Sequence, residues 1–156
     1  MIDISIPGFG EVHLAHLVLD FNGTLAVDGQ MVDGVSERLV ALSRLLSLHV
    51  VTADTFGNVS AQLGGIPADV HILPPGRQDE AKRDFVTGLG AARTAAIGNG
   101  RNDLLMLREA ALGIGVLLNE GAWGGTLTTA QVVCTSILDA LDLLIYPLRL
   151  TATLRA

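Results

Sequence analysis

The stretch LVLDFNGTL, Leu17 to Leu25, decides the fold of this chain of 156 residues. An apolar run delivers one carboxylate, Asp20, and the chain then turns at once through Phe21-Asn22-Gly23-Thr24. Strands that are buried on both faces read as continuous apolar runs, and ligands of open α/β sheets bind beyond the carboxyl ends of the strands. Asp20 thus stands where a nucleophile is expected, and Gly23 would let the backbone approach a bound group. The same residues also fit an Asx-turn that merely ends a strand.

Strand-like and helix-like segments alternate along the whole chain. This alternation predicts an α/β fold, with a parallel sheet and helices on both faces, in a single domain over residues 1–156. Within 26–32, the Asp28-Gly29 step favours a tight turn between two short strands, which predicts a small β-hairpin flap. The expected strands are 2–6, 12–19, 49–51, 70–73, 94–97, 112–117 and 132–134. The expected helices are 35–48, 58–63, 80–89, 102–111 and 136–146, the last of which Pro147 would end.

The composition of the chain indicates which kinds of partner the protein can be expected to bind. The net charge is −6 and Lys and Arg form no cluster, so nucleic acid is not expected as a partner. Only 17% of the residues are charged, against a usual share of about 25%, which favours a homo-oligomer that hides part of the surface. No apolar run approaches the ~18 residues of a membrane span, and the N-terminus does not read as a signal peptide. Cys134 is the one cysteine, so the chain cannot form an intramolecular disulfide. This favours a reducing compartment, and the protein is expected to be cytoplasmic.

Four segments place a polar group just past a predicted strand or on the helix that follows one. They are Asp20, Thr52 in VVTADT, Lys82 after the Pro74-Pro75-Gly76 turn, and the run GNGRND from Gly98 to Asp103. In a parallel sheet these positions converge on one edge. Lys82 is the only lysine, the other nine basic residues being arginines, which favours a function for it over a place on a solvated helix face.

Phosphoryl transfer requires such a set of groups. A carboxylate can act as the nucleophile and form an aspartyl phosphate, while a metal ion and a cation offset the charge on the phosphoryl oxygens. Asp20 would attack, Thr52 would donate its hydroxyl and Lys82 would supply the cation. Asp103 would help to hold Mg²⁺, which prefers oxygen ligands. The residues beside the nucleophile and the threonine are expected to contact the substrate: Gly23, Thr24, Ala53 and Asp54.

These four segments, in this order, resemble the four motifs of the haloacid dehalogenase (HAD) superfamily of phosphohydrolases. Within it, TADT and GNGRNDLLML are most similar to segments of the P-type ATPase phosphorylation domain and of the soluble P-type ATPase-like proteins. The resemblance spans residues 14–116. It implies a three-layer Rossmann-like fold, a phosphorylated substrate and Mg²⁺ as cofactor. It further implies that Asp20 is phosphorylated, that the Asn22 main-chain carbonyl binds Mg²⁺, and that Thr52 and Lys82 contact the phosphoryl group.

Two residues depart from the HAD pattern. The phosphatases carry an acid/base aspartate two residues after the nucleophile, where this chain has Asn22, and an amide does not shuttle a proton. General acid–base help is typically worth ~10²–10⁴-fold, so turnover is expected to be slow. Asn99 stands where the family has its main metal-binding aspartate, so Mg²⁺ affinity is expected to fall unless Asp54 or Asp103 compensates.

The short spacing between the motifs predicts a capless member of the family. Only residues 25–51 separate the first two motifs, which is room for the flap and one helix. Three functions remain open: a slow phosphohydrolase, a catalytically weak regulatory or phosphate-binding protein and, less favoured, a fragment of a nucleotide-binding ATPase. Trp123 is expected to pack in the core. The four histidines are expected to be structural, with His49 and His71 each standing alone, rather than zinc ligands.

Overall fold

The computed structural model describes residues 1–54 and 56–156, and its centre is a six-stranded parallel sheet. The strand order is β10-β9-β8-β3-β6-β7. These strands are β3 (His16–Leu19), β6 (Ser47–Thr52), β7 (Asp69–Ile72), β8 (Thr94–Gly98), β9 (Leu112–Val116) and β10 (Val132–Cys134). β3 lies in the middle and pairs with β6 on one side and β8 on the other, so the end of β3 is at the centre of the sheet.

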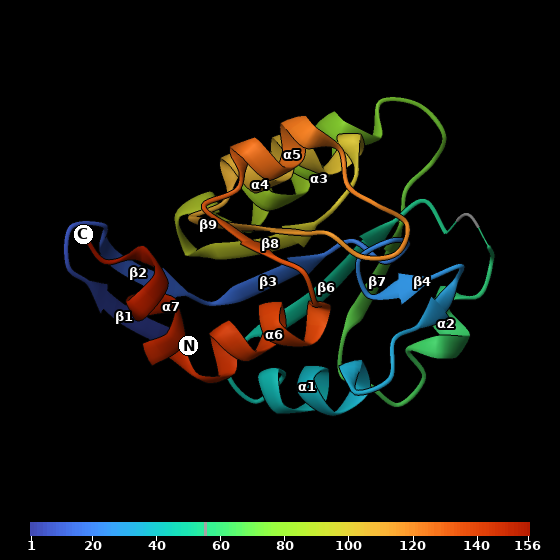
Figure 1. Ribbon diagram of the computed structural model, residues 1–156. Helices are drawn as coiled ribbons and strands as arrows, with labels where there is room; N and C mark the ends of the chain where they lie inside the picture. The colour runs from blue at the N-terminus through green and yellow to red at the C-terminus, as the bar shows by residue number, and fades with distance from the viewer. Residues whose placement is uncertain (55) are drawn as a thin grey trace.

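Helices cover both faces of this sheet (Figure 1). One face carries α3 (Gln78–Leu89), α4 (Leu104–Glu109) and α5 (Gly124–Thr129), and the other carries α1 (Val35–Leu42) and α6 (Ile137–Ile145). Two separate apolar cores result, because successive side chains of a strand point to opposite faces. Leu17 and Leu19 of β3 face one core and Val18 faces the other, and all three are fully buried. The three-layer α/β fold expected from the sequence is confirmed.

Two small hairpins flank the sheet. β4 (Ala26–Val27) and β5 (Gln30–Met31) form the predicted flap, and its turn has positive φ at Asp28 (50°) and Gly29 (75°). The Asn58 side-chain amide donates to the Gly29 carbonyl, so the flap tip is bound to α2 (Val59–Gln62). Among the described residues, no domain is inserted between β3 and β6, as expected for a capless chain.

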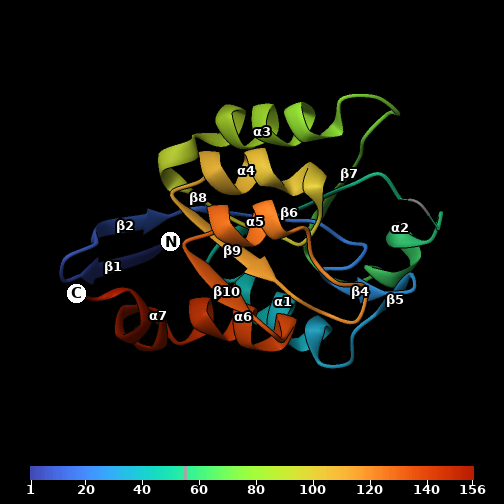
Figure 2. The same cartoon turned by 45° about the horizontal axis from the view of Figure 1, so that its top comes forward.

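The second hairpin is formed by β1 (Ile2–Ile6) and β2 (Gly10–Leu14), and it projects beyond the sheet together with α7 (Pro147–Leu154) (Figures 1 and 2). The expected single strand 12–19 is therefore divided. β2 pairs antiparallel with β1, whereas β3 pairs only within the main sheet. Pro147 begins a helix, because its missing N–H costs nothing at the first helical position.

Several helix boundaries differ from the expected ones. The helix expected over 35–48 ends at Leu42, because Ser47 N–H donates to the Ala15 carbonyl and Ser47 opens β6. The helix expected over 102–111 begins with a short 3-10 turn, η2 (Arg101–Asp103), and continues as α4. No helix was expected over the residues that form α5. No helix of the described chain is long and apolar enough to cross a membrane.

Candidate active site

Asp20 lies directly after β3, where the turn that follows is held by backbone hydrogen bonds. Its own N–H donates to the Ile97 carbonyl of β8 (3.0 Å), and the N–H groups of residues 24, 25 and 26 all donate to the Phe21 carbonyl. Phe21 is fully buried and anchors this turn. Gly23 has φ 78°, and a Cβ there would lie 2.4 Å from the Asn99 amide. Gly23 is thus required because the Asn99 side chain packs closely against it.

Lys82 joins the two carboxylates that the sequence singled out. Its Nζ donates to Asp20 Oδ1 and to Asp103 Oδ1, at 2.7 Å each. The Lys82 and Asp103 side chains are fully buried, and that of Asp20 is 8% exposed. The three groups come from parts of the chain that are far apart in the sequence, namely the turn after β3, α3 and η2. Two carboxylates and one ammonium group leave one net negative charge at this edge of the sheet.

The three charges shift one another's protonation. Burial and, second to it, the charge of Asp103 raise the pKa of Asp20 from 3.8 to about 6, although the charge and hydrogen bond of Lys82 act in the opposite direction. Burial of Lys82 by itself lowers its pKa, but the charges and hydrogen bonds of Asp103 and Asp20 outweigh this and raise the pKa above its usual value. Lys82 therefore stays a cation, and Asp20 is ionised above about pH 6.

Asp103 holds the loop that follows β8. Its Oδ2 accepts from the backbone N–H groups of Asn99 (3.0 Å) and Gly100 (2.8 Å), while its Oδ1 accepts from Lys82. A Cβ at Gly98 would lie 2.5 Å from the Asp103 carboxyl carbon, so the tight packing of this loop requires glycine there. Asp103 thus fixes both the lysine and the loop, with both of its oxygens in hydrogen bonds.

Oxygen atoms gather beside Asp20. The Thr24 hydroxyl lies 3.3 Å from Asp20 Oδ2 and 3.2 Å from Asn99 Oδ1. The Asn99 amide nitrogen donates to the Gly121 carbonyl, which leaves the amide oxygen to accept from the Thr24 hydroxyl. Asn22 Oδ1 is buried and has no hydrogen-bond partner among the described residues. Carboxylate and amide oxygens with an unfilled acceptor are a donor set that suits Mg²⁺.

Thr52 ends β6 and is 1% exposed. Its hydroxyl accepts from the Asp54 N–H (3.1 Å), and no hydrogen bond joins it to Asp20 or Lys82 in the described chain. Asp54 has φ 47°, and its carboxylate accepts from the first N–H groups of the α2 turn, Asn58 and Val59. Ala53 is half-buried between them. Thr55, the last residue of the TADT segment, lies outside the described residues.

A cavity of about 310 Å³ lies between α3 and η2, the two elements that carry Lys82 and Asp103, although neither of these residues lines it. It is lined by residues of the loop before α3 and of η2, namely Gly76, Gln78, Asp79, Arg101 and Asn102. The Arg101 guanidinium lies over the Trp123 ring, 5.4 Å from its centroid. Trp123 is 41% exposed, so the expectation that it packs in the core is wrong. The sequence had indicated no role for Gln78 or Arg101.

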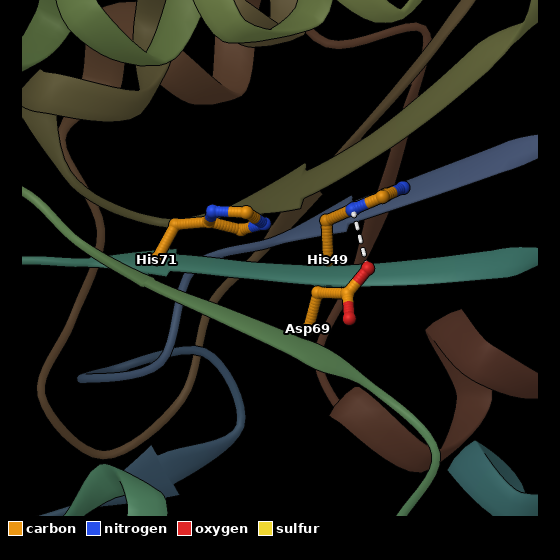
Figure 3. Close-up of side chains that lie close together, drawn as sticks. All are labelled: His49, Asp69 and His71. Carbon is orange, nitrogen blue, oxygen red and sulfur yellow. Dashed lines mark ion pairs between the residues drawn. The ribbon is translucent and has the colours of Figure 1, made fainter.

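The expectation that His49 and His71 stand alone is also wrong. They lie on the neighbouring strands β6 and β7, and together with Asp69 they place three potential ligand atoms within 4.8 Å of one another (Figure 3). The parallel register sets His49 beside Asp69 and Val51 beside His71. The sequence contains no signal for this register. The alternation of side chains along a strand shows which face of the sheet a residue lies on, but it does not show which residue lies beside it on the next strand.

Comparison with known sequences finds short local relatives, and no family model matches the chain. Uncharacterized protein MJ0073 of Methanocaldococcus jannaschii is 53% identical over 60 residues, which are 38% of this chain and 64% of that protein. The chain thus spans less than two thirds of that relative. Uncharacterized protein MJ0072 of the same organism is 44% identical over 39 residues, which are 25% of this chain and 89% of that protein.

Comparison with solved structures identifies the fold. A cobalt-bound deoxy-D-mannose-octulosonate 8-phosphate phosphatase from Haemophilus influenzae superposes with a TM-score of 0.71 at 14% identity, over 85% of this chain and 88% of that one. The corresponding phosphatase from Moraxella catarrhalis, in complex with magnesium, phosphate and KDO, gives 0.65 at 19% identity, over 85% and 86%.

A phosphatase of the HAD enzyme superfamily from Bacteroides thetaiotaomicron gives a TM-score of 0.63 at 13% identity, over 90% of this chain and 96% of that one. At such identities the likeness concerns the fold. The chain therefore has the fold of the HAD superfamily phosphatases, and it belongs to one sequence family with the short Methanocaldococcus protein MJ0072.

Proposed function

We propose that this protein is a Mg²⁺-dependent phosphohydrolase of HAD type that works through a phosphorylated Asp20. The observation that carries the proposal is the buried triad in which Lys82 Nζ lies 2.7 Å from both Asp20 and Asp103 at the carboxyl edge of the sheet. A fully buried lysine between two carboxylates stabilises a fold poorly compared with apolar residues, whereas it suits a site where phosphoryl charge develops.

The reaction consists of two displacements at phosphorus. A carboxylate oxygen of Asp20 attacks the phosphoryl group, the bond from phosphorus to the ester oxygen breaks, and an aspartyl phosphate forms. Water then attacks the phosphorus atom of that intermediate, which releases inorganic phosphate and returns the Asp20 carboxylate. Lys82 offsets the charge of the phosphoryl oxygens during both displacements, and the Thr52 hydroxyl donates to one of them.

The oxygens beside Asp20 would hold the magnesium ion. We assign this role to the Asp20 carboxylate, the Asn99 amide oxygen and the Asn22 main-chain carbonyl, with Asp103 fixing the loop that carries Asn99. When bound, Mg²⁺ supplies positive charge that neutralises the phosphoryl oxygens in the transition state. Asn99 brings no negative charge, so the affinity for Mg²⁺ is expected to be low compared with a site of two carboxylates.

Asn22 makes both steps slow. An amide at position 22 gives no proton to the leaving oxygen and takes none from the attacking water. The P-type ATPase-like resemblance predicts the same behaviour, a long-lived phosphoenzyme. Substrates with good leaving groups are therefore expected to react, and others to react poorly.

The substrate is proposed to be a small phosphorylated molecule. The cavity of about 310 Å³ is in the size range of small-molecule sites, and Arg101 is one of its lining residues. The Haemophilus and Moraxella proteins named above are phosphatases of a deoxy-octulosonate 8-phosphate. Gly23, Thr24, Ala53 and Asp54 border the phosphoryl site. We further propose that the protein acts in the cytoplasm and as a homo-oligomer. A measurement of its mass in solution tests the oligomeric state.

Hydrolysis of an activated aryl phosphate with Mg²⁺ tests this function. Wild-type protein is expected to release the phenol slowly, Asp20→Asn to release none, and Asn22→Asp to raise kcat by ~10²-fold or more, because the added carboxylate acts as a base for the water that attacks the aspartyl phosphate. Absence of product from wild type and from Asn22→Asp alike would exclude the enzyme. That result would favour the second candidate, a regulatory or phosphate-binding protein, which the two amides Asn22 and Asn99 support.

A further inference from the structure

A second cluster of potential metal ligands lies on the face of the sheet that α3 covers. His49 of β6 stands beside Asp69 of β7 in the parallel register, and His71 follows two residues later on the same face. Figure 3 shows the far ring nitrogen of His71 pointing toward His49, and the Asp69 carboxylate pointing toward the near nitrogen of His49. One ligand atom from each residue lies within 4.8 Å of the other two.

Two nitrogens of this cluster lack hydrogen-bond partners. Among the described residues, His49 Nδ1 and His71 Nε2 are buried and make no hydrogen bond. The His49 side chain is 9% exposed, and 3.7 Å separates its Nδ1 from Asp69 Oδ2, which is too long for a hydrogen bond. A buried polar atom without a partner costs free energy, so such atoms in a native protein point to a missing ion, water or ligand.

We propose that His49 Nδ1, His71 Nε2 and the Asp69 carboxylate bind one transition-metal ion of the zinc type, at a site separate from the magnesium site at Asp20. Imidazole nitrogens suit zinc, cobalt and nickel, whereas Mg²⁺ takes oxygen ligands. Ligand atoms of a tetrahedral zinc ion lie about 3.3 Å apart, given bonds near 2.0 Å. The separation of 3.7 Å between His49 and Asp69 is close to this value, and Asp69, whose side chain is 74% exposed, can move toward the ion.

His16 supplies the orienting contact that such a site requires. His16 Nδ1 lies 3.3 Å from His49 Nε2. In the proposed site His49 Nε2 donates its proton to His16 Nδ1, which leaves the lone pair of His49 Nδ1 free for the metal. Metal-binding histidines commonly donate their other N–H in this way. Burial and the neighbouring His16 lower the pKa of His49 despite Asp69, so the imidazole is neutral and able to bind near neutral pH.

Phe85 of α3 closes the inner side of the site. Its ring centroid lies 5.6 Å from that of His49 and 4.5 Å from that of His71. The exposed Asp69 leaves the outer side open, so water would complete the coordination. The ion would join β6 to β7, which is the edge strand of the sheet, and would thereby stabilise the strand that leads into the loop before α3.

Zinc titration in competition with a chromophoric chelator tests the site, with excess Mg²⁺ present to occupy the oxygen ligands near Asp20. Wild type and Asp20→Asn are expected to bind one equivalent of Zn²⁺ and to gain thermal stability from it. His71→Ala and Asp69→Asn change half-buried or exposed side chains that folding tolerates, and both are expected to lose at least ~10-fold in zinc affinity. His16→Ala is expected to lose ~10–100-fold, as other orienting partners do.

His13→Ala is the matched control. His13 also pairs with an aspartate, Asp3, at 2.7 Å, but on the exposed hairpin and without a second histidine. Its removal is expected to leave zinc binding unchanged. The proposal is overturned if wild type binds no zinc, if His71→Ala binds zinc as wild type does, or if Asp20→Asn alone abolishes binding. Cobalt bound in place of zinc is expected to give the strong visible absorption of a four-coordinate ion, and weak octahedral bands would likewise contradict the site.

Discussion

At the scale of single residues, the chemistry depends on a buried charge cluster with one cation for two carboxylates. Lys82 is fully buried and both its partners lie at 2.7 Å, so its removal leaves two like charges close together in a site that water hardly reaches. The charge cluster that prepares Asp20 for a phosphoryl group therefore also lowers the free energy of unfolding of the free protein. Two substitutions separate these effects.

Lys82→Met is expected to abolish phosphatase activity and to cost ~3–5 kcal/mol of unfolding free energy at neutral pH, because one buried ion pair partner is lost. Denaturant unfolding with activity assays measures both. Arg83→Met is the control on the next residue, since Arg83 pairs with Asp84 on the surface. It is expected to change neither quantity, and a loss of stability as large as that of Lys82→Met would contradict the account.

Asp20→Asn is expected to stabilise the magnesium-free protein while abolishing activity. The folded protein holds a proton on Asp20 up to about pH 6, whereas the unfolded chain releases it near pH 3.8. Native protein thus binds more protons between these values, so the contribution of Asp20 to stability is present at low pH and is lost as pH rises through about 6. Asparagine does not ionise, so the Asp20→Asn variant does not lose this stability as the pH rises. Its gain over wild type is expected to be absent near pH 3.5 and of the order of 1–3 kcal/mol at pH 8. Unfolding curves that run parallel across this range would contradict the pKa shift.

At the scale of elements, the site exists because the ends of β3, β6 and β8 meet at one edge and because the loop after β8 packs tightly on Asp103. Gly98→Ala tests the loop. Its Cβ would lie 2.5 Å from the Asp103 carboxyl carbon, so Asp103 must move and Lys82 with it. A fall in kcat/KM of at least ~10-fold is expected, which corresponds to about 1.4 kcal/mol in the transition state.

Gly88→Ala is the matched control, a glycine-to-alanine change in a helix where the added methyl group displaces nothing. A Cβ at Gly88, within α3, meets nothing within 4 Å. Alanine there is expected to leave activity unchanged and to add up to ~1 kcal/mol of stability, because it restricts the unfolded chain and favours the helix. Equal activity of Gly98→Ala and Gly88→Ala would show that the packing of the β8 loop is unimportant for catalysis.

At the scale of the whole molecule, the sequence predicts the three-layer arrangement of sheet and helices well. It predicts poorly which residues lie beside one another on adjacent strands. Asp20, Lys82 and Asp103 could be placed at one edge because every parallel strand ends there. His49, Asp69 and His71 could not be grouped, because their contact depends on the register of β6 against β7. The helix over 35–48 was predicted six residues too long, since sheet pairing of Ser47 outweighs the helical spacing of the leucines. The helix expected over 136–146 does end before Pro147, but the sequence did not predict that Pro147 also begins the next helix, α7.

The central claim is that Asp20 becomes phosphorylated, and peptide mapping after an acid quench tests it most directly. Wild-type protein is incubated with Mg²⁺ and an activated aryl phosphate, quenched in acid, digested and analysed by mass spectrometry. We predict one phosphoryl group on Asp20 in the peptide that contains LVLDFNGTL, more of it in wild type than in the faster Asn22→Asp variant, and none in Asp20→Asn. A phosphoryl group on another residue, or product released without any phosphorylated peptide in wild type, would contradict the account.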